Sequence, residues 1–365
     1  MIKFCTRIFS LFAISASVLM LLISGSFASG HGGTTKVGFV YLTTPGDHGW
    51  TYAHELGKQM VEKRFGKNVK ISVVENVPEG PDATRVIREL AKQGNEIIFT
   101  TSFGYMEPTL KVAKEFPNIK FEHITGYKRS KNVATGNIRF YEGRYVQGVV
   151  AGLMTKTNKI CYVAAYPIPE VIREINTYYM GAKKMNPNVD IDIVWANTWY
   201  NPSKEADAAN VMMAEGCDMV AQHTDSPAPL QAAQSQGKLG FGQASDQYKF
   251  APKAQLTATI DNWGPYYVKK VGQVIAGTWQ KENYFGDMDE GAVQMAPFTN
   301  MPDNVKMKAA EIKQAISDGK YFAFTGPIKD NTGKLQLKDG EIADDAHLNT
   351  MMYYVEGIDA TVPGN

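Results

Sequence analysis

The chain has 365 residues, of which 44% are hydrophobic and 21% are charged, enough apolar sequence for two ordinary domains and too much for a disordered chain. Lys and Arg number 38, and Asp and Glu number 37, so the chain lacks the basic surplus expected of a protein that binds nucleic acid. Three cysteines, Cys5, Cys161 and Cys217, are too few for a disulfide-dense scaffold or a zinc site of four thiolates. Packed apolar cores must therefore hold the fold.

The first residues have the order of a secretory signal peptide. Lys3 and Arg7 precede an apolar run at residues 8–23, and small residues follow up to Ala28. The alternative is a membrane anchor, but this run is shorter than the roughly 20 residues that cross a bilayer. We therefore expect a signal peptide at residues 1–28, cleavage near Ala28 and export to the periplasm.

Short β-rich runs alternate with helical patterns along the remaining chain, which is typical of parallel sheets built from βαβ units. A first series of five strands is predicted at residues 36–42, 69–76, 96–103, 119–125 and 133–138. A second series of five is predicted at residues 159–166, 189–197, 218–224, 239–244 and 255–261. Helices are predicted at residues 82–94, 142–154, 170–185, 203–215, 264–279 and 303–316. We expect an α/β protein of two doubly wound lobes, with a ligand cleft between them at the carboxyl ends of the strands.

Cys161 and Cys217 fall at the starts of two predicted strands of the second series. Because export would take the chain to a compartment that permits disulfides, a disulfide between the two cysteines is one alternative. The interpretation that we favour from the sequence is two buried free thiols, which pack as small apolar side chains.

Aromatic and acidic residues gather at the predicted strand ends. Trp50, Trp199 and Trp263 lie in these loops, and flat rings that face each other across a cleft suit a planar ligand. Neighbouring carboxylates can accept hydrogen bonds from ring N–H or amino groups of such a ligand. Each tryptophan can instead be a core residue, and each aspartate can cap a helix. The other candidate ligand-binding residues in these loops are Phe103, Glu107, Asp225, Asp246 and Asp261.

Motifs for catalysis and cofactor binding are missing from the sequence. It has no phosphate-binding loop, no nucleophile elbow and no complete dinucleotide fingerprint, and its histidines lack metal-ligand spacing. Glu107 and Asp246 can be imagined as the carboxylate pair of a secreted hydrolase, but only their separation in space would identify such a pair. We therefore expect no catalysis, no cofactor and no metal.

The combination of several motifs resembles the basic membrane protein family. The matching segments are the opening strand KVGFVY, the GDHGW loop, Thr125-Gly126, the EGRYVQG run at residues 142–148 and the NPSK segment at residues 201–204. Members of this family are solute-binding proteins of ABC importers with the two-lobed type I periplasmic binding protein fold. The resemblance covers about residues 36–325 and implies a first lobe at residues 36–137 plus about 263–300. The second lobe is then expected at residues 138–262 plus about 301–365.

Characterised members of that family bind purine nucleosides between two aromatic rings. The resemblance places Trp50 and Trp199 at the stacking positions, and it assigns contacts with the base to Glu107, after Phe103, and to Asp246. This sequence departs from the family in having Trp where Phe is usual.

Two further departures change loops of the second lobe. Residues 223–225 replace a glycine-rich loop, and residues 261–262 replace a basic residue at the end of the last strand of this lobe. Bulkier side chains where a ribose would lie favour a smaller ligand, and the acidic cluster favours an uncharged, donor-rich ring. We therefore expect a free purine base such as adenine, with guanine or hypoxanthine also possible.

The expected partners are a purine and the permease and ATPase subunits of an ABC importer, and we expect the binding protein itself to be a monomer. Two alternatives remain from the sequence. One is a protein of the same fold that binds a nucleoside, a sugar or an autoinducer. The other is a ligand-sensing subunit that signals to a membrane receptor.

Overall fold

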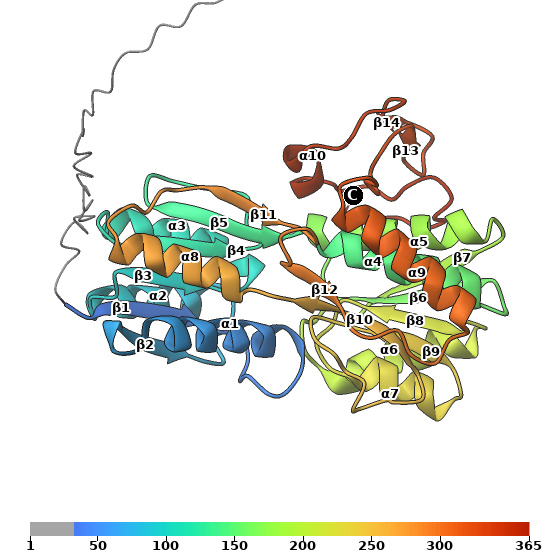
Figure 1. Ribbon diagram of the computed structural model, residues 1–365, viewed down its shortest axis with the longest axis horizontal. Helices are drawn as coiled ribbons and strands as arrows, with labels where there is room; N and C mark the ends of the chain where they lie inside the picture. The colour runs from blue at the N-terminus through green and yellow to red at the C-terminus, as the bar shows by residue number, and fades with distance from the viewer. Residues whose placement is uncertain (1–32, 365) are drawn as a thin grey trace, which may run out of the picture.

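Two six-stranded sheets form the cores of two lobes that lie side by side in the computed structural model, which describes residues 33–364 (Figure 1). The expected signal peptide lies outside the described residues. The first sheet has the order β11-β5-β4-β3-β1-β2, and all its pairs are parallel. Its strands are β1 (Thr35–Val40), β2 (Val69–Val74), β3 (Ile97–Thr100), β4 (Lys120–Ile124), β5 (Val133–Ile138) and β11 (Asn283–Gly286).

The second sheet repeats this arrangement with the order β12-β10-β9-β8-β6-β7. Its pairs are parallel except that β12 runs antiparallel to β10. Its strands are β6 (Lys159–Ala164), β7 (Asp190–Trp195), β8 (Met219–Gln222), β9 (Leu239–Gly242), β10 (Gln255–Asp261) and β12 (Val293–Met295). The ten strands predicted from the sequence are all present, and the two-lobed α/β fold class is confirmed.

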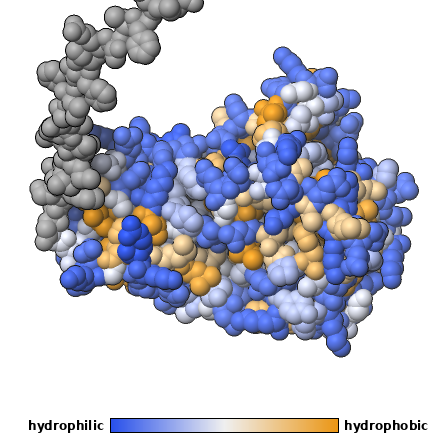
Figure 2. Space-filling view, in the orientation of Figure 1, coloured by the Kyte–Doolittle hydropathy of each residue, from blue (hydrophilic) through white to orange (hydrophobic). Residues whose placement is uncertain are grey.

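Helices cover both faces of each sheet (Figure 1). In the first lobe, α1 (Gly49–Phe65) packs on α8 (Gly264–Ile275), and α2 (Pro81–Lys92) packs on α3 (Met106–Glu115). In the second lobe, α4 (Phe140–Met154) packs on α5 (Pro169–Met185), and α6 (Pro202–Ala214) packs on α7 (Ala228–Ser235). The face shown in Figure 2 is mostly hydrophilic, with smaller hydrophobic patches over both lobes. Among residues 33–364, no helix has both the length and the apolar character of a membrane span.

The helix ends follow the signals in the sequence. Asn201 caps α6 by accepting a hydrogen bond from the backbone N–H of Lys204 at 3.1 Å, and Pro202 occupies the first turn, where its missing N–H costs no hydrogen bond. The carboxylate of Glu205 accepts a hydrogen bond from the backbone N–H of Asn201 at 2.7 Å, which closes this capping arrangement. These contacts fix where α6 begins and therefore where the preceding loop lies.

The chain crosses between the lobes three times: between β5 and α4, between β10 and α8, and between β11 and β12. Because β12 belongs to the second sheet, the last crossing comes before residue 293, whereas the sequence suggests a boundary near residue 300. After α9 (Asp303–Ser317), the tail forms the small hairpin β13 (Ile328–Lys329) and β14 (Leu335–Leu337) and the short helix α10 (Asp345–Asn349). This tail packs beside α4 and α5 of the second lobe (Figure 1).

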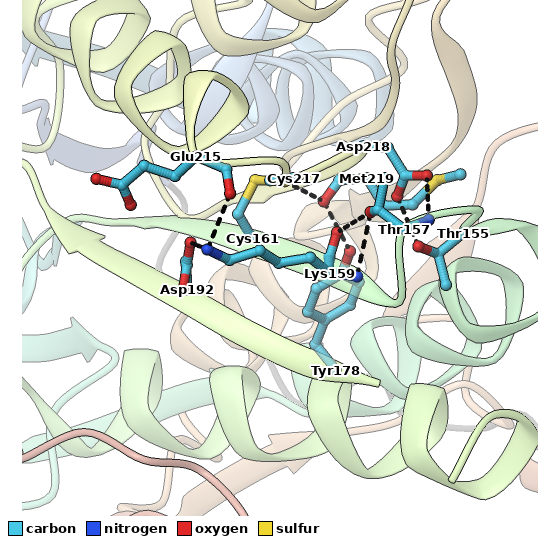
Figure 3. The surroundings of a disulfide bond; sticks show 10 residues. All are labelled: Thr155, Thr157, Lys159, Cys161, Tyr178, Asp192, Glu215, Cys217, Asp218 and Met219. Atoms are coloured by element: carbon cyan, nitrogen blue, oxygen red, sulfur yellow. Dashed lines mark hydrogen bonds and ion pairs between the residues drawn. A yellow bond between two sulfur atoms is a disulfide. The ribbon is translucent and has the colours of Figure 1, made fainter. Parts of the chain in front are cut away.

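Cys161 and Cys217 form a disulfide, so the interpretation of two free thiols is wrong (Figure 3). Cys161 lies on β6, and Cys217 precedes β8, which is the neighbouring strand. Their Cα atoms are therefore only 6.0 Å apart, within the range that a disulfide spans. Both side chains are fully buried in the apolar layer between the second sheet and α6.

Candidate functional site

A small cavity lies between the two lobes, at the carboxyl ends of the strands. The first lobe contributes residues that follow β1, β3 and β4, and the second lobe contributes residues that follow β8 and β9, a loop after β7 and the first turn of α5. The lining residues are Leu42, Trp50, Ser102, Phe103, Thr125, Glu170, Trp199, His223, Asp225 and Gln243. Apolar rings and a few polar groups thus line the cavity together, a combination that is typical of small-molecule sites.

Trp50 lines the cavity from the first turn of α1. Its indole Nε1 donates a hydrogen bond to the backbone oxygen of Thr101 at 2.7 Å, which fixes the ring plane. Behind it, the rings of His54 and Trp263 lie edge-on to the Trp50 ring, with centroids at 4.3 and 5.6 Å. Trp263 is fully buried in this packing and does not line the cavity, so its contribution is to hold Trp50 in place.

Trp199 lines the cavity from the opposite lobe, in the loop between β7 and the cap of α6. Its ring packs against Tyr166 and His223, with centroid distances of 5.0 and 6.2 Å. Its indole Nε1 points to Glu79 Oε2 of the first lobe at 3.4 Å. Trp199 is therefore held by its own lobe and linked to the other.

Glu79 also shapes the loop that carries Phe103. Its Oε1 accepts hydrogen bonds from Ser102 Oγ at 2.5 Å and from the backbone N–H of Gly104 at 2.8 Å. Sequence reasoning did not single out Glu79, because it lies in a turn before α2 and its role depends on contacts with residues far along the chain.

Asp225 lies at the lobe boundary, and it is the lining aspartate. Burial raises the pKa of its carboxyl to about 8, with a further contribution from the negative charge of Glu205, while a hydrogen bond from the backbone N–H of Trp50 acts in the opposite direction. The backbone N–H of Asp225 donates to the Trp199 oxygen at 3.0 Å. Asp225 thus contacts the backbone segments that carry both lining tryptophans.

A second acidic group reaches the cavity from α5. Glu170 and Glu174 lie one helical turn apart, and the His223 ring sits between them, with Nε2 at 3.3 Å from Glu170 Oε1 and Nδ1 at 3.1 Å from Glu174 Oε2. Arg144 Nε donates to the same Glu174 oxygen at 2.7 Å. Although burial alone would lower the pKa of His223, the two glutamates raise it to about 10, so the ring is an imidazolium at neutral pH.

The structure does not bring two of the predicted acidic residues to the cavity. Glu107 lies on the exposed face of α3, where it pairs with Lys128 at 2.5 Å, whereas its neighbours Met106 and Pro108 are buried. Asp246 is exposed and accepts hydrogen bonds from Gln255 Nε2 at 2.7 Å and from the backbone N–H of Tyr248 at 3.0 Å.

Asp261 is buried at the end of β10 but does not line the cavity. Neither of its carboxylate oxygens has a hydrogen-bond partner among the described residues, and burial raises its pKa well above the usual range, assisted by the charge of Glu174. The protonated, neutral form is therefore the stable one beside the Glu174 and His223 charges.

The two lobes contact each other at the rim of the cavity. The backbone N–H of Gly49 donates to Ser245 Oγ at 2.9 Å, Asp47 pairs with Lys249, and the ring of His48 meets the edge of Phe250 at 5.0 Å. Each of these contacts joins the start of α1 to the second lobe, so the cavity is held in a closed arrangement.

Comparisons with known proteins agree with this architecture. A family model described as ABC transporter substrate-binding protein PnrA-like matches residues 34–332. A purine-binding protein of Brucella abortus is 50% identical over 328 residues, which cover 90% of this chain and 94% of that protein. A putative ABC transporter glucose-binding protein of Haloferax volcanii is 32% identical over 333 residues, which cover 91% of this chain and 82% of that protein.

Among solved structures, an ABC transporter solute-binding protein of Aeropyrum pernix superimposes with a TM-score of 0.68 at 17% identity, covering 81% of this chain and 93% of that one. At this identity the likeness speaks for the fold alone. The family model and the Brucella abortus relative at 50% identity assign the chain to a protein family as well as to a fold. The chain belongs to the PnrA-like family of ABC transporter substrate-binding proteins, as the motifs in its sequence suggested.

Proposed function

We propose that this protein binds a free purine base, adenine in particular, between Trp50 and Trp199 and delivers it to an ABC importer. The observation that carries the proposal is the cavity between the lobes, whose lining includes a tryptophan from each lobe. Stacking and desolvation of a flat ring between such side chains supply affinity, and polar groups at the ring edge supply selectivity.

The bulk of the side chains that line the cavity favours a base over a nucleoside. His223 and Asp225 line the cavity in the loop where the family resemblance would put a ribose, and a contact of Gly49 joins the two lobes at the rim. A ribose would have to displace some of these groups.

The polar lining suits an uncharged ring that carries hydrogen-bond donors. Glu170 presents a carboxylate to the cavity, and a neutral Asp225 can donate as well as accept a hydrogen bond. A phosphate or carboxylate on the ligand would be repelled by the Glu170 carboxylate, while the His223 imidazolium is already paired with Glu170 and Glu174. The purine-binding relative at 50% identity supports the same ligand class.

Transport follows from the family. Export to the periplasm, by the leader expected at residues 1–28, would place the protein where it meets its solute, and closure of the lobes would present one composite surface to the permease and ATPase partners. We propose that it acts as a monomer.

A thermal-shift screen tests the ligand class. The protein is unfolded, washed free of any ligand and refolded without reductant, so that the disulfide is kept. Adenine, guanine, hypoxanthine, adenosine and glucose are then added separately, because a ligand that binds only the native state raises the melting temperature. Adenine should give the largest shift and adenosine little. A shift with glucose alone would replace the proposal with a sugar-binding function, which the relative from Haloferax volcanii represents.

A further inference from the structure

A row of three buried charged side chains, Glu170, Glu174 and His223, lies at one wall of the cavity, and the proposed function uses only the Glu170 carboxylate. Glu170 is 5% exposed, Glu174 is 0% exposed, and His223 is 5% exposed. Of the three residues, Glu170 and His223 line the cavity, whereas Glu174 lies deeper. Burying several charges is costly unless they are paired, so this row needs an explanation.

The three side chains come close enough to suggest a metal site, with ligand atoms within 4.8 Å of one another. Their geometry favours a protonated histidine between two carboxylates over a bound metal ion. His223 turns one ring nitrogen to Glu170 and the other to Glu174, whereas a metal would bind one nitrogen, with both carboxylates converging on the same point. Arg144 already occupies Glu174 Oε2 at 2.7 Å, and its positive charge opposes a nearby cation.

Two cations, Arg144 and His223, balance the charges of the two glutamates. Arg144 and His223 counter the burial of Glu174 and lower its pKa to about 2, so this carboxylate stays ionised. The imidazolium of His223 in turn neutralises Glu170 and holds its Oε1. The ring lies between the two glutamates and forms an ion pair with each.

The second oxygen of the Glu170 carboxylate, Oε2, accepts no hydrogen bond from the described residues. It is buried, and Arg173 Nη2 forms an ion pair with it at 4.0 Å, beyond hydrogen-bond distance. A buried carboxylate oxygen without a donor is destabilising, and a ligand that brings an N–H group to it removes that cost.

We infer that Glu170 is a specificity-determining residue of this site, whose Oε2 accepts a hydrogen bond from an amino or ring N–H group on the edge of the base, and that His223 is the residue that positions it. The inference rests on the proposed function, because it assumes a heterocyclic base in the cavity. It assigns the recognition of the ligand's hydrogen-bond donors to a side chain of α5 rather than to Glu107 and Asp246.

Ligand analogues test the inference without relying on a variant that must fold. Calorimetry compares adenine with unsubstituted purine, which lacks the amino group, and with 9-methyladenine, which lacks the ring N–H of the imidazole part. The parent should bind at least one analogue about tenfold or more weakly than adenine, as expected for a lost charge-assisted hydrogen bond. In Glu170→Ala and Glu170→Gln, that difference should shrink, because the acceptor is gone or is weaker.

The positioning role of His223 has its own readout. His223→Asn should weaken the binding of adenine but leave nearly unchanged the affinity for the analogue that the parent binds more weakly than adenine. General damage to the fold would weaken the binding of both ligands. Glu122→Gln is the matched control: it alters a fully buried carboxylate of the first lobe, paired there with Lys270 and Tyr266, and should preserve the ratio of the two affinities.

Three outcomes would overturn the inference, and they are separable. If the parent binds adenine but neither analogue difference changes in the Glu170 variants, the inference fails and the proposed function stands. If the parent binds no purine, both fail. If the ligand-free parent binds Zn²⁺ in calorimetry and His223→Asn does not, the cluster is a metal site. The assignment of His223 as an imidazolium paired with two glutamates is then wrong.

Discussion

Trp199 carries the stacking part of the proposed site in the second lobe. It lines the cavity, and it packs against Tyr166 and His223. Removing a buried aromatic anchor typically costs about 2 kcal/mol or more of binding free energy. Calorimetry with adenine should therefore show Trp199→Ala weakened by at least that amount, and Trp199→Phe by much less. Tyr248→Ala, which removes an exposed ring outside the cavity lining, should bind like the parent.

Asp225 gives the molecule a pH dependence with a definite sign. Its pKa rises on folding from the ordinary value of 3.8 to about 8, so between these pH values the folded state holds a proton that the unfolded chain releases. The stability contributed by that proton is fully present below about pH 4 and is lost as the pH rises through about 8.

Asp225→Asn mimics the protonated carboxyl and should remove this contribution. Urea unfolding of the ligand-free protein at pH 5 and pH 8 should show a smaller loss of stability in the variant than in the parent. An equal loss in both proteins would mean that the Asp225 carboxyl is not kept neutral by burial.

The candidate site could be predicted in part. Trp50, Phe103, Trp199 and Asp225 were predictable because each follows a strand whose carboxyl end must open toward the cleft. Glu170 was not, because an acidic residue in the first turn of a helix is common for local electrostatic reasons and gives no signal of its own. Glu107 and Asp246 follow strands as well, but side-chain direction within a loop is set by packing that a sequence pattern does not encode.

At the scale of elements, the periodicity of the sequence predicted all ten strands of the two repeated series. The predicted helices are also present, with ends shifted by a few residues. β11 and β12 were not predicted, because they are four and three residues long and pair only with strands far along the chain. No strand or helix was predicted in the tail after residue 326, because its hairpin is equally short and packs on the second lobe.

The disulfide ties two neighbouring strands of the second lobe. Cys161 and Cys217 are 56 residues apart, and closing a loop of that length typically stabilises the folded state by about 2–4 kcal/mol. The double variant Cys161→Ala/Cys217→Ala should lose stability of this order in urea unfolding under oxidising conditions. Its affinity for adenine should stay close to that of the parent, because both cysteines lie at the amino-terminal ends of their strands, opposite the cavity. A large loss of affinity would show that the bond shapes the site.

At the scale of the molecule, closure depends on how near the start of α1 comes to the second lobe. A Cβ on Gly49 would lie 2.7 Å from the backbone oxygen of Asp225, and its φ of 76° disfavours other residues as well. Gly46 lies in the same loop, but a Cβ there would meet nothing nearer than 3.9 Å, and its φ is outside the left-handed region.

Gly49→Ala should therefore keep the lobes apart. Small-angle X-ray scattering should show the stripped parent contracting when adenine is added, the Gly49→Ala variant contracting less and binding more weakly, and the Gly46→Ala variant behaving like the parent. Equal contraction of all three proteins would mean that the contact of Gly49 with Asp225 does not limit closure.

The central claim is that the interlobe cavity holds a purine base between two tryptophans, and a crystal structure of the refolded protein with adenine tests it most directly. The account predicts one adenine in the cavity, with its faces against Trp50 and Trp199 and a nitrogen-bound hydrogen directed at Glu170. An adenine bound elsewhere, or one in the cavity that contacts neither tryptophan, would contradict it.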